Sequence, residues 1–277
     1  MVVEYAALLV LGVLVGAFGT LVGAGGGFLL VPILLLLYPD LEPDTVTAMS
    51  LLVVFVNASS GSVAYARQKR IDFWSGGWFA LATLPGSVAG AIAVGYLPRR
   101  GFDVVFALVL AVLGAYLLLQ RTPNPIQRDP LVGRWVIRRR IRDRDGQTFV
   151  YAYRFWEGMA ISLVVGFVSS LLGIGGGIVH VPVMAIALHF PVHIATATSH
   201  FVLAMMALQA TGTHLVTGSL GWGEPLAHAV TIAVGAGVGA QIGARASHRV
   251  RGPAILRALG AALVLVSLRL AFSAWRG

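Results

Sequence analysis

Two glycine-rich phrases lie inside very apolar parts of the chain and are the first candidates for chemistry. Their consecutive glycines are Gly25, Gly26 and Gly27 in GAGGGF and Gly175, Gly176 and Gly177 in GIGGGI. Glycines in a row interrupt a helix, and irregular backbone at membrane depth is tolerated only where protein buries it or where it lines a watery cavity. A helix that restarts after such a break has about four unpaired amide N–H groups and roughly half a positive charge at its N-terminus. The phrases therefore predict two helix N-termini that bind an anion.

Polar side chains inside the apolar runs are the next candidates, because polar groups at membrane depth are costly and tend to be functional. Hydroxyl and amide groups can donate hydrogen bonds to the oxygens of an anion without burying a fixed opposite charge. The side chains expected to bind substrate in this way are Thr47, Ser50, Asn57, Thr198, Ser199 and Gln209. For each serine and threonine, the alternative is a hydrogen bond to the carbonyl group about four residues earlier in its own helix.

Histidine is the side chain that could couple transport to protons near neutral pH. His180, His200 and His214 lie in or beside apolar runs. His200 is the best candidate because it directly follows the phrase TATS, and both His200 and His214 are expected at the substrate site. The alternative for each of the three is a neutral, hydrogen-bonded histidine that serves packing.

The chain lacks the residues that most enzymatic reactions require. There is no cysteine, which excludes thiol catalysis and disulfides. There is no HExxH phrase, and Glu157 and Glu224 stand at the ends of apolar runs rather than deep inside them. We therefore expect a protein that is not an enzyme and that uses no cofactor and no metal.

The elements that carry these residues are predicted to be membrane-spanning helices. Of the 277 residues, 57% are hydrophobic and only 11% are charged, whereas about a quarter are charged in a soluble domain. The apolar runs are continuous rather than alternating, which favours helices over a β-barrel, and several approach the roughly 20 residues that a span needs. The sequence predicts an all-α, multi-pass protein of the cell (cytoplasmic) membrane.

The second half of the chain repeats the first. Gly23 and Pro32, which flank the first glycine phrase, have counterparts in Gly173 and Pro182 at an offset of 150 residues, and TAMS at 47–50 corresponds to TATS at 196–199. Each half is expected to hold four to five transmembrane segments, with one helix broken at a GxGGG motif. The predicted domains are a first transmembrane repeat over 1–120, a basic cytoplasmic linker over 121–154 and a second transmembrane repeat over 155–277.

A further set of glycines is predicted to serve close packing of helices rather than binding. Small residues let membrane helices approach one another, and the phrases PGSVAGA and VGAGVGA present them on one helix face. The glycines in question are Gly86, Gly90, Gly235 and Gly239.

Length and charge together favour inverted repeats. The segment Tyr5–Leu37 would measure about 50 Å as one helix, which is too long for one crossing and too short for two. A break at the glycines would turn its second piece back as a re-entrant hairpin, and three full spans would follow. The basic phrases at 67–70 and 245–251 and the linker would then all face the cytoplasm. Four crossings in each of two parallel repeats is the alternative.

The polar linker RTPNPIQRDPLVGRWVIRRRIRDRDGQTFVYAYR carries nine of the twenty basic residues. A cytoplasmic topology signal explains this charge, so no nucleic-acid partner is expected. The alternative is a role in binding lipid headgroups or in docking a partner. Within the linker, RWVIRRRIRD could form a short amphipathic strand or an interfacial helix, and both remain open.

At these residues the sequence resembles the TauE/SafE family of duplicated membrane proteins, also called the sulfite exporter or anion permease family. The matching phrases are GTLVGAGGGFLLVPIL at 19–34, SSLLGIGGGIVHVPVM at 169–184, TAMS, TATS, and GTHLVTGSLGW at 212–222. The resemblance covers both halves but not the linker. It implies transport of sulfite, sulfoacetate or related sulfur-containing or organic anions. The halves differ where the first has YARQKRIDF at 65–73.

The leading hypothesis is a secondary transporter in which the two half-helix N-termini hold a small anion, with proton coupling through a histidine as one mode. A passive anion channel would use the same amides without a proton-linked group. A non-transporting membrane scaffold would instead use the basic linker as its docking site. The expected partners are the anionic substrate and the lipid bilayer, and a homo-oligomer remains open.

Overall fold

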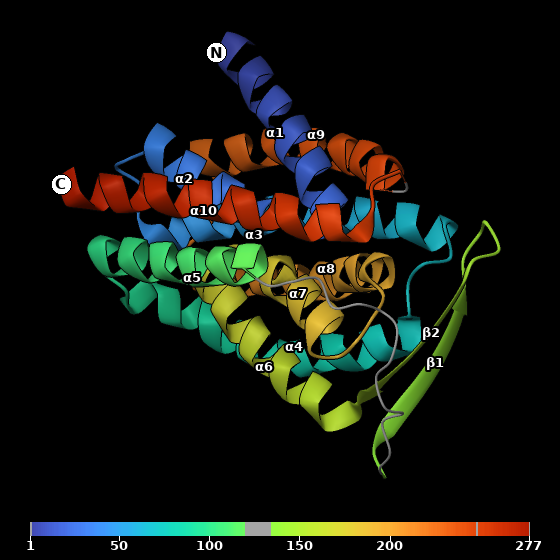
Figure 1. The fold of residues 1–277 in the computed structure, drawn as a ribbon. Coiled ribbons are helices and arrows are strands. Elements are labelled where there is room, and N and C mark those ends of the chain that lie inside the picture. The colour runs from blue at the N-terminus through green and yellow to red at the C-terminus, as the bar shows by residue number, and fades with distance from the viewer. Residues whose placement is uncertain (1, 120–133, 248, 277) are drawn as a thin grey trace.

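The protein is a bundle of helices with a small two-stranded sheet at one end (Figure 1). The computed structural model describes residues 2–119, 134–247 and 249–276, so that 121–133 of the predicted linker lie outside the described residues. The first half contains α1 (Val2–Val22), α2 (Gly27–Leu37), α3 (Pro43–Arg67), α4 (Phe73–Ala93), the 3-10 helix η1 (Val94–Tyr96) and α5 (Arg99–Leu119). The second half contains α6 (Phe155–Leu172), α7 (Gly177–Ile186), α8 (Val192–Thr217), α9 (Glu224–Ser247) and α10 (Gly252–Arg276).

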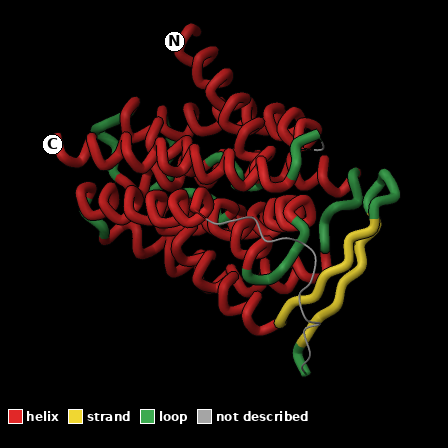
Figure 2. Tube along the Cα trace, viewed as in Figure 1, coloured by secondary structure: helices red, strands yellow, loops and turns green. Residues whose placement is uncertain are grey.

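Seven of the described helices are long and apolar enough to cross a membrane. They are α1, α3, α4 with η1, α5, α6, α8 and α9, and α8 is the most enclosed of them, with 78% of its apolar window buried. The helices α2 and α7 are apolar but too short to span. The prediction of a helical, multi-pass membrane protein is confirmed, with the small sheet as an addition to it (Figure 2).

The helix break in the first half falls at the predicted glycines and turns the chain back. Gly23, Gly25 and Gly26 adopt positive φ angles of 79°, 73° and 84°, which glycine reaches without the steric cost of a side chain. The ring of His228 contacts Tyr5, near the start of α1, and also Tyr38, which follows α2. The α1–α2 unit therefore enters and leaves at the same end of the bundle.

The corresponding unit of the second half, α6–α7, enters from the other end. Strand β2 (Thr148–Arg154) runs directly into α6, and its Tyr151 and Tyr153 contact the ring of Phe190, which follows α7. Helix α3 runs from the end occupied by Tyr38 to the end occupied by the sheet. The two broken helices are thus approached from opposite ends.

Basic segments from three parts of the chain meet at the sheet end, which we call the basic end. The Gln68 amide, after α3, donates to the carbonyl group of Ala244 in α9 at 3.0 Å. Arg70 pairs with Asp143 of the linker, Nη2 to Oδ2, at 3.2 Å. The segments 67–70 and 134–154 and the end of α9 therefore lie on one side of the bundle.

The linker segment left open by the sequence is a strand, not a helix. β1 (Val136–Arg142) pairs antiparallel with β2, from Val136 opposite Arg154 to Arg142 opposite Thr148. Successive side chains of a strand point to opposite faces. Arg139 accordingly lies on the half-buried inner face, whereas Arg138 and Arg140 are exposed on the outer face.

Glycines allow backbone-to-backbone contact at two helix pairs. A Cβ atom on Gly235 or Gly239 of α9 would collide with the carbonyl groups of Leu9 and Val13 in α1. A Cβ atom on Gly86 and Gly90 of α4 would likewise collide with the carbonyl groups of Leu163 and Phe167 in α6. The packing role predicted for these four glycines is confirmed.

Adding one methyl group at the α4–α6 contact should destabilise the protein. In Gly86→Ala the new Cβ meets the α6 backbone, which cannot move aside as a side chain would, and overpacking of this kind costs about 1–3 kcal/mol. We expect a melting temperature in detergent lower by about 5 °C. Gly77→Ala is the matched control, because a Cβ at Gly77 of the same helix meets nothing within 4 Å. Equal melting temperatures of the two variants would contradict this packing.

Candidate functional site

The two glycine breaks face each other in the interior. A Cβ atom on Gly27 would lie 2.6 Å from the carbonyl oxygen of Gly173, and one on Gly177 would collide with the carbonyl oxygen of Gly23. Gly26 and Gly176, both with positive φ, stand at the N-caps of α2 and α7, and neither helix has a side-chain cap. The first amide groups of both short helices are therefore not satisfied by any capping side chain.

Apolar side chains, rather than open space, pack against both breaks. A Cβ atom on Gly25 would lie 2.5 Å from Leu203 and 3.2 Å from Val54, and one on Gly175 would lie 2.6 Å from Val54 and 3.2 Å from Leu203. Both side chains are buried, on α8 and α3. Gly25 and Gly175 thus pack against the same Val54–Leu203 pair.

A narrow crevice lies beside the N-terminus of α7. Its lining includes Gly176, Gly177, Thr83, His180, Ser199 and Met206, and it leaves no room for a molecule of the size of water. The Oγ atom of Ser199 is buried and has no hydrogen-bond partner among the described residues. Nε2 of His180 lies 3.2 Å from the hydroxyl group of Ser162. An uncapped helix N-terminus and an unpaired buried hydroxyl group therefore border the same crevice.

Protein atoms occupy the surroundings of the α2 N-terminus. Ser50, which corresponds in the repeat to Ser199, donates to the carbonyl oxygen of Gly173 at 2.7 Å. A Cβ atom on Gly26 would lie 2.7 Å from a methyl group of Val15. The two breaks are alike in backbone but different in what surrounds them.

A second polar cluster joins α1, α3 and α8 in the interior. The hydroxyl group of Thr20 donates to Oδ1 of Asn57 at 2.6 Å and lies 3.1 Å from Nε2 of His200. Nε2 of His200 also lies 3.3 Å from Oδ1 of Asn57, and the Tyr65 hydroxyl group donates to the carbonyl oxygen of Thr20 at 2.7 Å. All four residues are buried. The sequence analysis predicted Asn57 and His200 as site residues but not Thr20. The sequence feature that could have identified Thr20 is its position three residues before the first glycine phrase.

The remaining predicted residues are distributed along α3 and α8. Thr47 packs against Gly173, and its hydroxyl group has no hydrogen-bond partner in the described part of the chain. Gln209 is half-buried and accepts from Ser87 at 3.4 Å. His214 is buried, and neither ring nitrogen has a hydrogen-bond partner among the described residues. Gln209 and His214 lie about 13 and 21 Å beyond His200 along α8, so the structure does not bring them to the central cluster.

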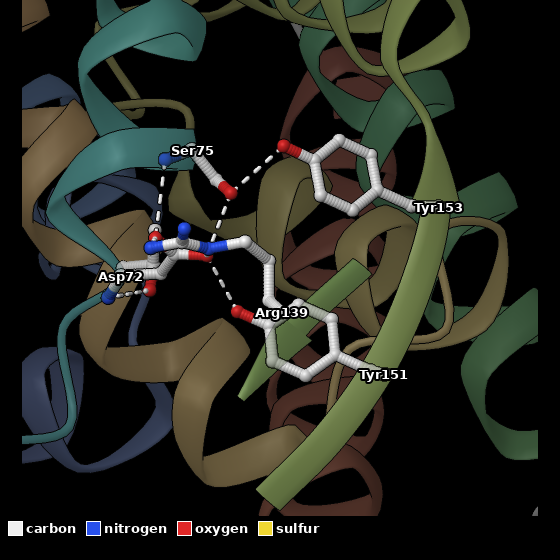
Figure 3. A network of polar contacts seen from close by, with 6 residues as sticks. Asp72, Ser75, Arg139, Tyr151 and Tyr153 are labelled. Carbon is white, nitrogen blue, oxygen red and sulfur yellow. Dashed lines mark hydrogen bonds and ion pairs between the residues drawn. The ribbon is translucent and has the colours of Figure 1, made fainter. Parts of the chain in front are cut away.

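Thr198 contacts a different network, which is centred on Asp72 at the basic end (Figure 3). Its hydroxyl oxygen accepts from the backbone N–H of Asp72 at 3.0 Å. The Asp72 carboxylate, at the N-cap of α4, accepts from the hydroxyl group of Ser75 at 2.6 Å, from that of Tyr151 at 2.6 Å and from Arg139 at 2.8 and 3.0 Å. Tyr153 donates to Ser75 at 2.8 Å. The inner face of the β1–β2 hairpin is thereby bonded to the start of α4.

The charges in this network are stable over the physiological pH range. Burial alone would raise the pKa of Asp72, but hydrogen bonds from Arg139, Ser75 and Tyr151 outweigh it, so the pKa of this carboxyl lies below its ordinary value. The hydrogen bond to Asp72 raises the pKa of Arg139. Burial raises the pKa of Tyr151, with a further contribution from Asp72, and raises the pKa of Tyr153 to about 12. Asp72 is therefore ionised and both phenols are neutral near pH 7.

Seven candidate spans around two buried helix breaks define the class of protein, a multi-pass helical membrane protein. A family model described as sulfite exporter TauE/SafE matches residues 8–270. The chain belongs to this family, as the glycine phrases predict.

Curated relatives agree with the class. The chain is 30% identical over 275 residues to the probable membrane transporter protein YunE of Bacillus subtilis (strain 168), covering 97% of this chain and 98% of that protein. It is 27% identical over 220 residues to a probable membrane transporter protein of Methanocaldococcus jannaschii, covering 78% and 74% of the two chains. No solved structure matches the chain.

Neutralising Asp72 should destabilise the protein in a pH-dependent way. Because its folded pKa is depressed, the ionised carboxylate stabilises the fold above the unfolded pKa of about 3.9, and this contribution is lost as the pH falls through the folded pKa. Asp72→Asn weakens hydrogen bonds to a charged group, worth about 1.5–3 kcal/mol each, so we expect a melting temperature lower by about 5 °C at pH 7.

The difference between wild type and Asp72→Asn should be constant from about pH 8 to pH 5 and should shrink below about pH 4. Asp40→Asn is the control, because Asp40 is exposed in the loop between α2 and α3. A gap between wild type and Asp72→Asn that widens on acidification would show that the carboxylate is not held in its ionised form.

Proposed function

We propose that this transporter moves a small anion, such as sulfite, sulfoacetate or another organosulfonate, across the cell membrane. The anion is held at the GxGGG breaks by the N-terminal amides of the two short helices. The observation that carries the proposal is the uncapped N-terminus of α7 beside a crevice that also contains the unpaired hydroxyl group of Ser199.

Neutral donors suit an anion that must be released again. The aligned peptides of α2 and α7 place partial positive charge at their N-termini without a buried fixed cation. Gly25–Gly27 and Gly175–Gly177 let a ligand approach that backbone closely. A sulfonate or sulfite presents several acceptor oxygens, which match amide and hydroxyl donors. The family description supports the sulfur oxyanion class, since the names of the relatives specify only membrane transport.

The closed crevice implies that the structure represents an occluded state of the cycle. With no room for a water-sized molecule, the crevice must widen before an anion enters. Leu203, which lines the crevice, and Val54, which also packs against both breaks, are the side chains that such widening would part. In this proposal α2 supports the site and α7 provides most of it, because the α2 N-terminus is filled by Val15 and by the Ser50–Gly173 bond.

We further propose that the two halves are inverted duplicates which rock against each other. Support comes from the recurring element order and from the opposite ends at which α1–α2 and α6–α7 enter. Inverted repeats with broken helices at their interface are the usual architecture for alternating access. The excess of arginine and lysine assigns the basic end to the cytoplasm.

Proton coupling would use the Thr20–Asn57–His200 cluster, which touches both halves. His200 belongs to α8, whereas Thr20 and Asn57 belong to α1 and α3, so a change in the protonation of the ring would alter bonds between the halves. A passive channel is the second candidate, since it would use the same amides without this step.

Binding of the proposed substrates should raise the melting temperature of the purified protein. Ligands that bind only the folded state stabilise it by about 2.7 kcal/mol at a hundred times their dissociation constant. We expect the largest shifts from sulfite or sulfoacetate in a panel that also contains sulfate, thiosulfate and short carboxylates.

Ser199→Ala should weaken the binding of the most stabilising anion about tenfold, since it removes one hydrogen bond to a charged ligand. Ser219→Ala, in the loop between α8 and α9, is the control and should leave binding unchanged. Indifference of the wild type to every anion in the panel would count against the function, whereas binding that tolerates Ser199→Ala would count only against the α7 site.

Replacing His200 separates a proton-coupled carrier from a channel. In proteoliposomes loaded with the anion found in the binding screen, His200→Ala should abolish accumulation driven by a proton gradient but retain flow down the anion's own gradient. His193→Ala, in the first turn of α8, serves as the control. Undiminished accumulation in His200→Ala would remove this histidine from the coupling mechanism.

A further inference from the structure

The β1–β2 hairpin covers the basic end of the helices that line the crevice. Its Tyr151 and Tyr153 rings lie 4.4 and 5.1 Å from the ring of Phe190, between α7 and α8, and the Tyr153 ring lies 5.6 Å from that of Phe79 in α4. These side chains belong to one apolar cluster that continues to Val202 in α8, and Val202 lines the crevice. Between the crevice and the basic end there is therefore continuous protein, and the hairpin is its outermost layer (Figure 1).

Buried charges, not only apolar contacts, hold the hairpin in this position. The side chains of Asp72 and Arg139 are 0% and 31% exposed, and those of Arg70 and Asp143 are 5% and 1% exposed. In each pair one charge belongs to the segment between α3 and α4 and the other to the hairpin. Desolvating such pairs costs most of what their attraction gains, so they are poor stabilisers but fix one arrangement against others.

Two features of the contact between the hairpin and the segment between α3 and α4 would allow it to open. Nε and Nη1 of Arg70 are buried and have no hydrogen-bond partner among the described residues, so hydration on opening would satisfy them. Strand β2 leads into α6 without a loop, which gives the hairpin a fixed pivot at Arg154–Phe155. In β1, Arg139 also lies over the ring of Trp74, 5.4 Å from its centre.

One residue connects this contact to the interior. The carboxylate of Asp72 accepts hydrogen bonds from Arg139 and Tyr151 of the hairpin (Figure 3). Its backbone N–H donates to Thr198 of α8. Thr198 directly precedes Ser199, whose hydroxyl group borders the crevice, and His200, which joins the Thr20–Asn57 cluster. A displacement of Asp72 would therefore move α8 at Thr198, within one helical turn of both Ser199 and His200.

We propose that the β1–β2 hairpin is the cytoplasmic gate of the transport path, and that Asp72 is the positioning residue which couples this gate to α8 through Thr198. The proposal rests on the proposed function for the location of the path beside α7. Closed, the hairpin seals the crevice from the basic end; released from Asp72, it swings about its junction with α6 and admits the substrate.

The test follows the exposure of Ser199 and does not require a known substrate. Because the chain has no cysteine, Ser199→Cys introduces a single thiol at the crevice. Its rate of modification by N-ethylmaleimide is measured in the full-length protein in lipid nanodiscs, first with the hairpin intact and then with Arg139→Gln. We expect Arg139→Gln to speed the reaction about tenfold or more, the factor that one charge-assisted hydrogen bond gives to an opening equilibrium.

Two controls separate opening of the gate from loss of fold or charge. Arg138→Gln makes the same change one residue earlier on the exposed outer face of β1, and it should leave the rate unchanged. Ala229→Cys, buried in α9, reports general loosening, and its rate should be the same with and without Arg139→Gln. Tyr151→Phe, which removes one hydrogen bond to Asp72, should give an intermediate rate at the Ser199→Cys thiol, and Arg139→Lys should restore part of the protection.

The outcomes decide between the alternatives. Faster modification at the Ser199→Cys thiol alone supports the gate. Faster modification at both cysteines, or at neither, overturns it, because the hairpin would then be a structural support or irrelevant to access. A gate that opens as expected in a protein whose melting temperature no anion raises would leave the gate standing and remove the proposed substrate class.

Discussion

The fold depends on satisfying the backbone of two helix breaks in an interior that offers no water. An unpaired backbone N–H or C=O group in hydrocarbon costs on the order of several kcal/mol. A glycine break therefore cannot face lipid. The structure meets this constraint by placing each break against the other: Gly27 against Gly173, and Gly177 against Gly23. The long helices then arrange themselves around this pair. Helix α1 packs on α9 and α6 packs on α4, each through glycines that allow backbone contact. In both pairs one helix belongs to the first half and the other to the second, so these contacts hold the halves together.

Similar backbones do not make the two breaks chemically equivalent. At α2, Val15 fills the space beside Gly26, and the hydroxyl group of Ser50 donates a hydrogen bond to the carbonyl oxygen of Gly173. At α7, Ser199 keeps its hydroxyl group free within the described structure and a crevice remains. The difference between the breaks therefore lies in the neighbouring hydroxyl groups: that of Ser50 already has a partner, whereas that of Ser199 has none among the described residues and is the donor on which the proposed site relies.

The sequence predicted the features that depend on local pattern. Glycine runs, apolar length and the offset of 150 residues led to the breaks, to the short helices and to the packing role of Gly86 and Gly239. It could not predict contacts between distant segments. Asp72 and Arg139 are separated by 67 residues, and nothing near Asp72 marks it as the centre of a network. The linker alternation fitted a strand or an interfacial helix equally, and only the partner strand decided between them. His214 was predicted on the same grounds as His200, as a histidine in or beside an apolar run. It lies nearly four turns further along α8, and the list of polar residues in a run does not reveal this distance.

The interior and the hairpin, which is the proposed gate, differ in the charged groups that they contain. The interior polar clusters contain hydroxyl groups, amides and an imidazole, whereas the Arg70–Asp143 and Arg139–Asp72 pairs lie at the basic end, against the hairpin. Since the pKa of Asp72 is lowered and that of Arg139 is raised, a change of pH within the physiological range does not release the pair. Release must instead come from differential binding, and a ligand shifts an equilibrium only by the difference between its affinities for the two states. An anion attracted to the basic end is chemically suited to this, because it competes with the Asp72 carboxylate for Arg139. The negative charge that opens the path would then be that of the substrate itself, which makes the gate selective for the sign of charge before the helix N-termini are reached.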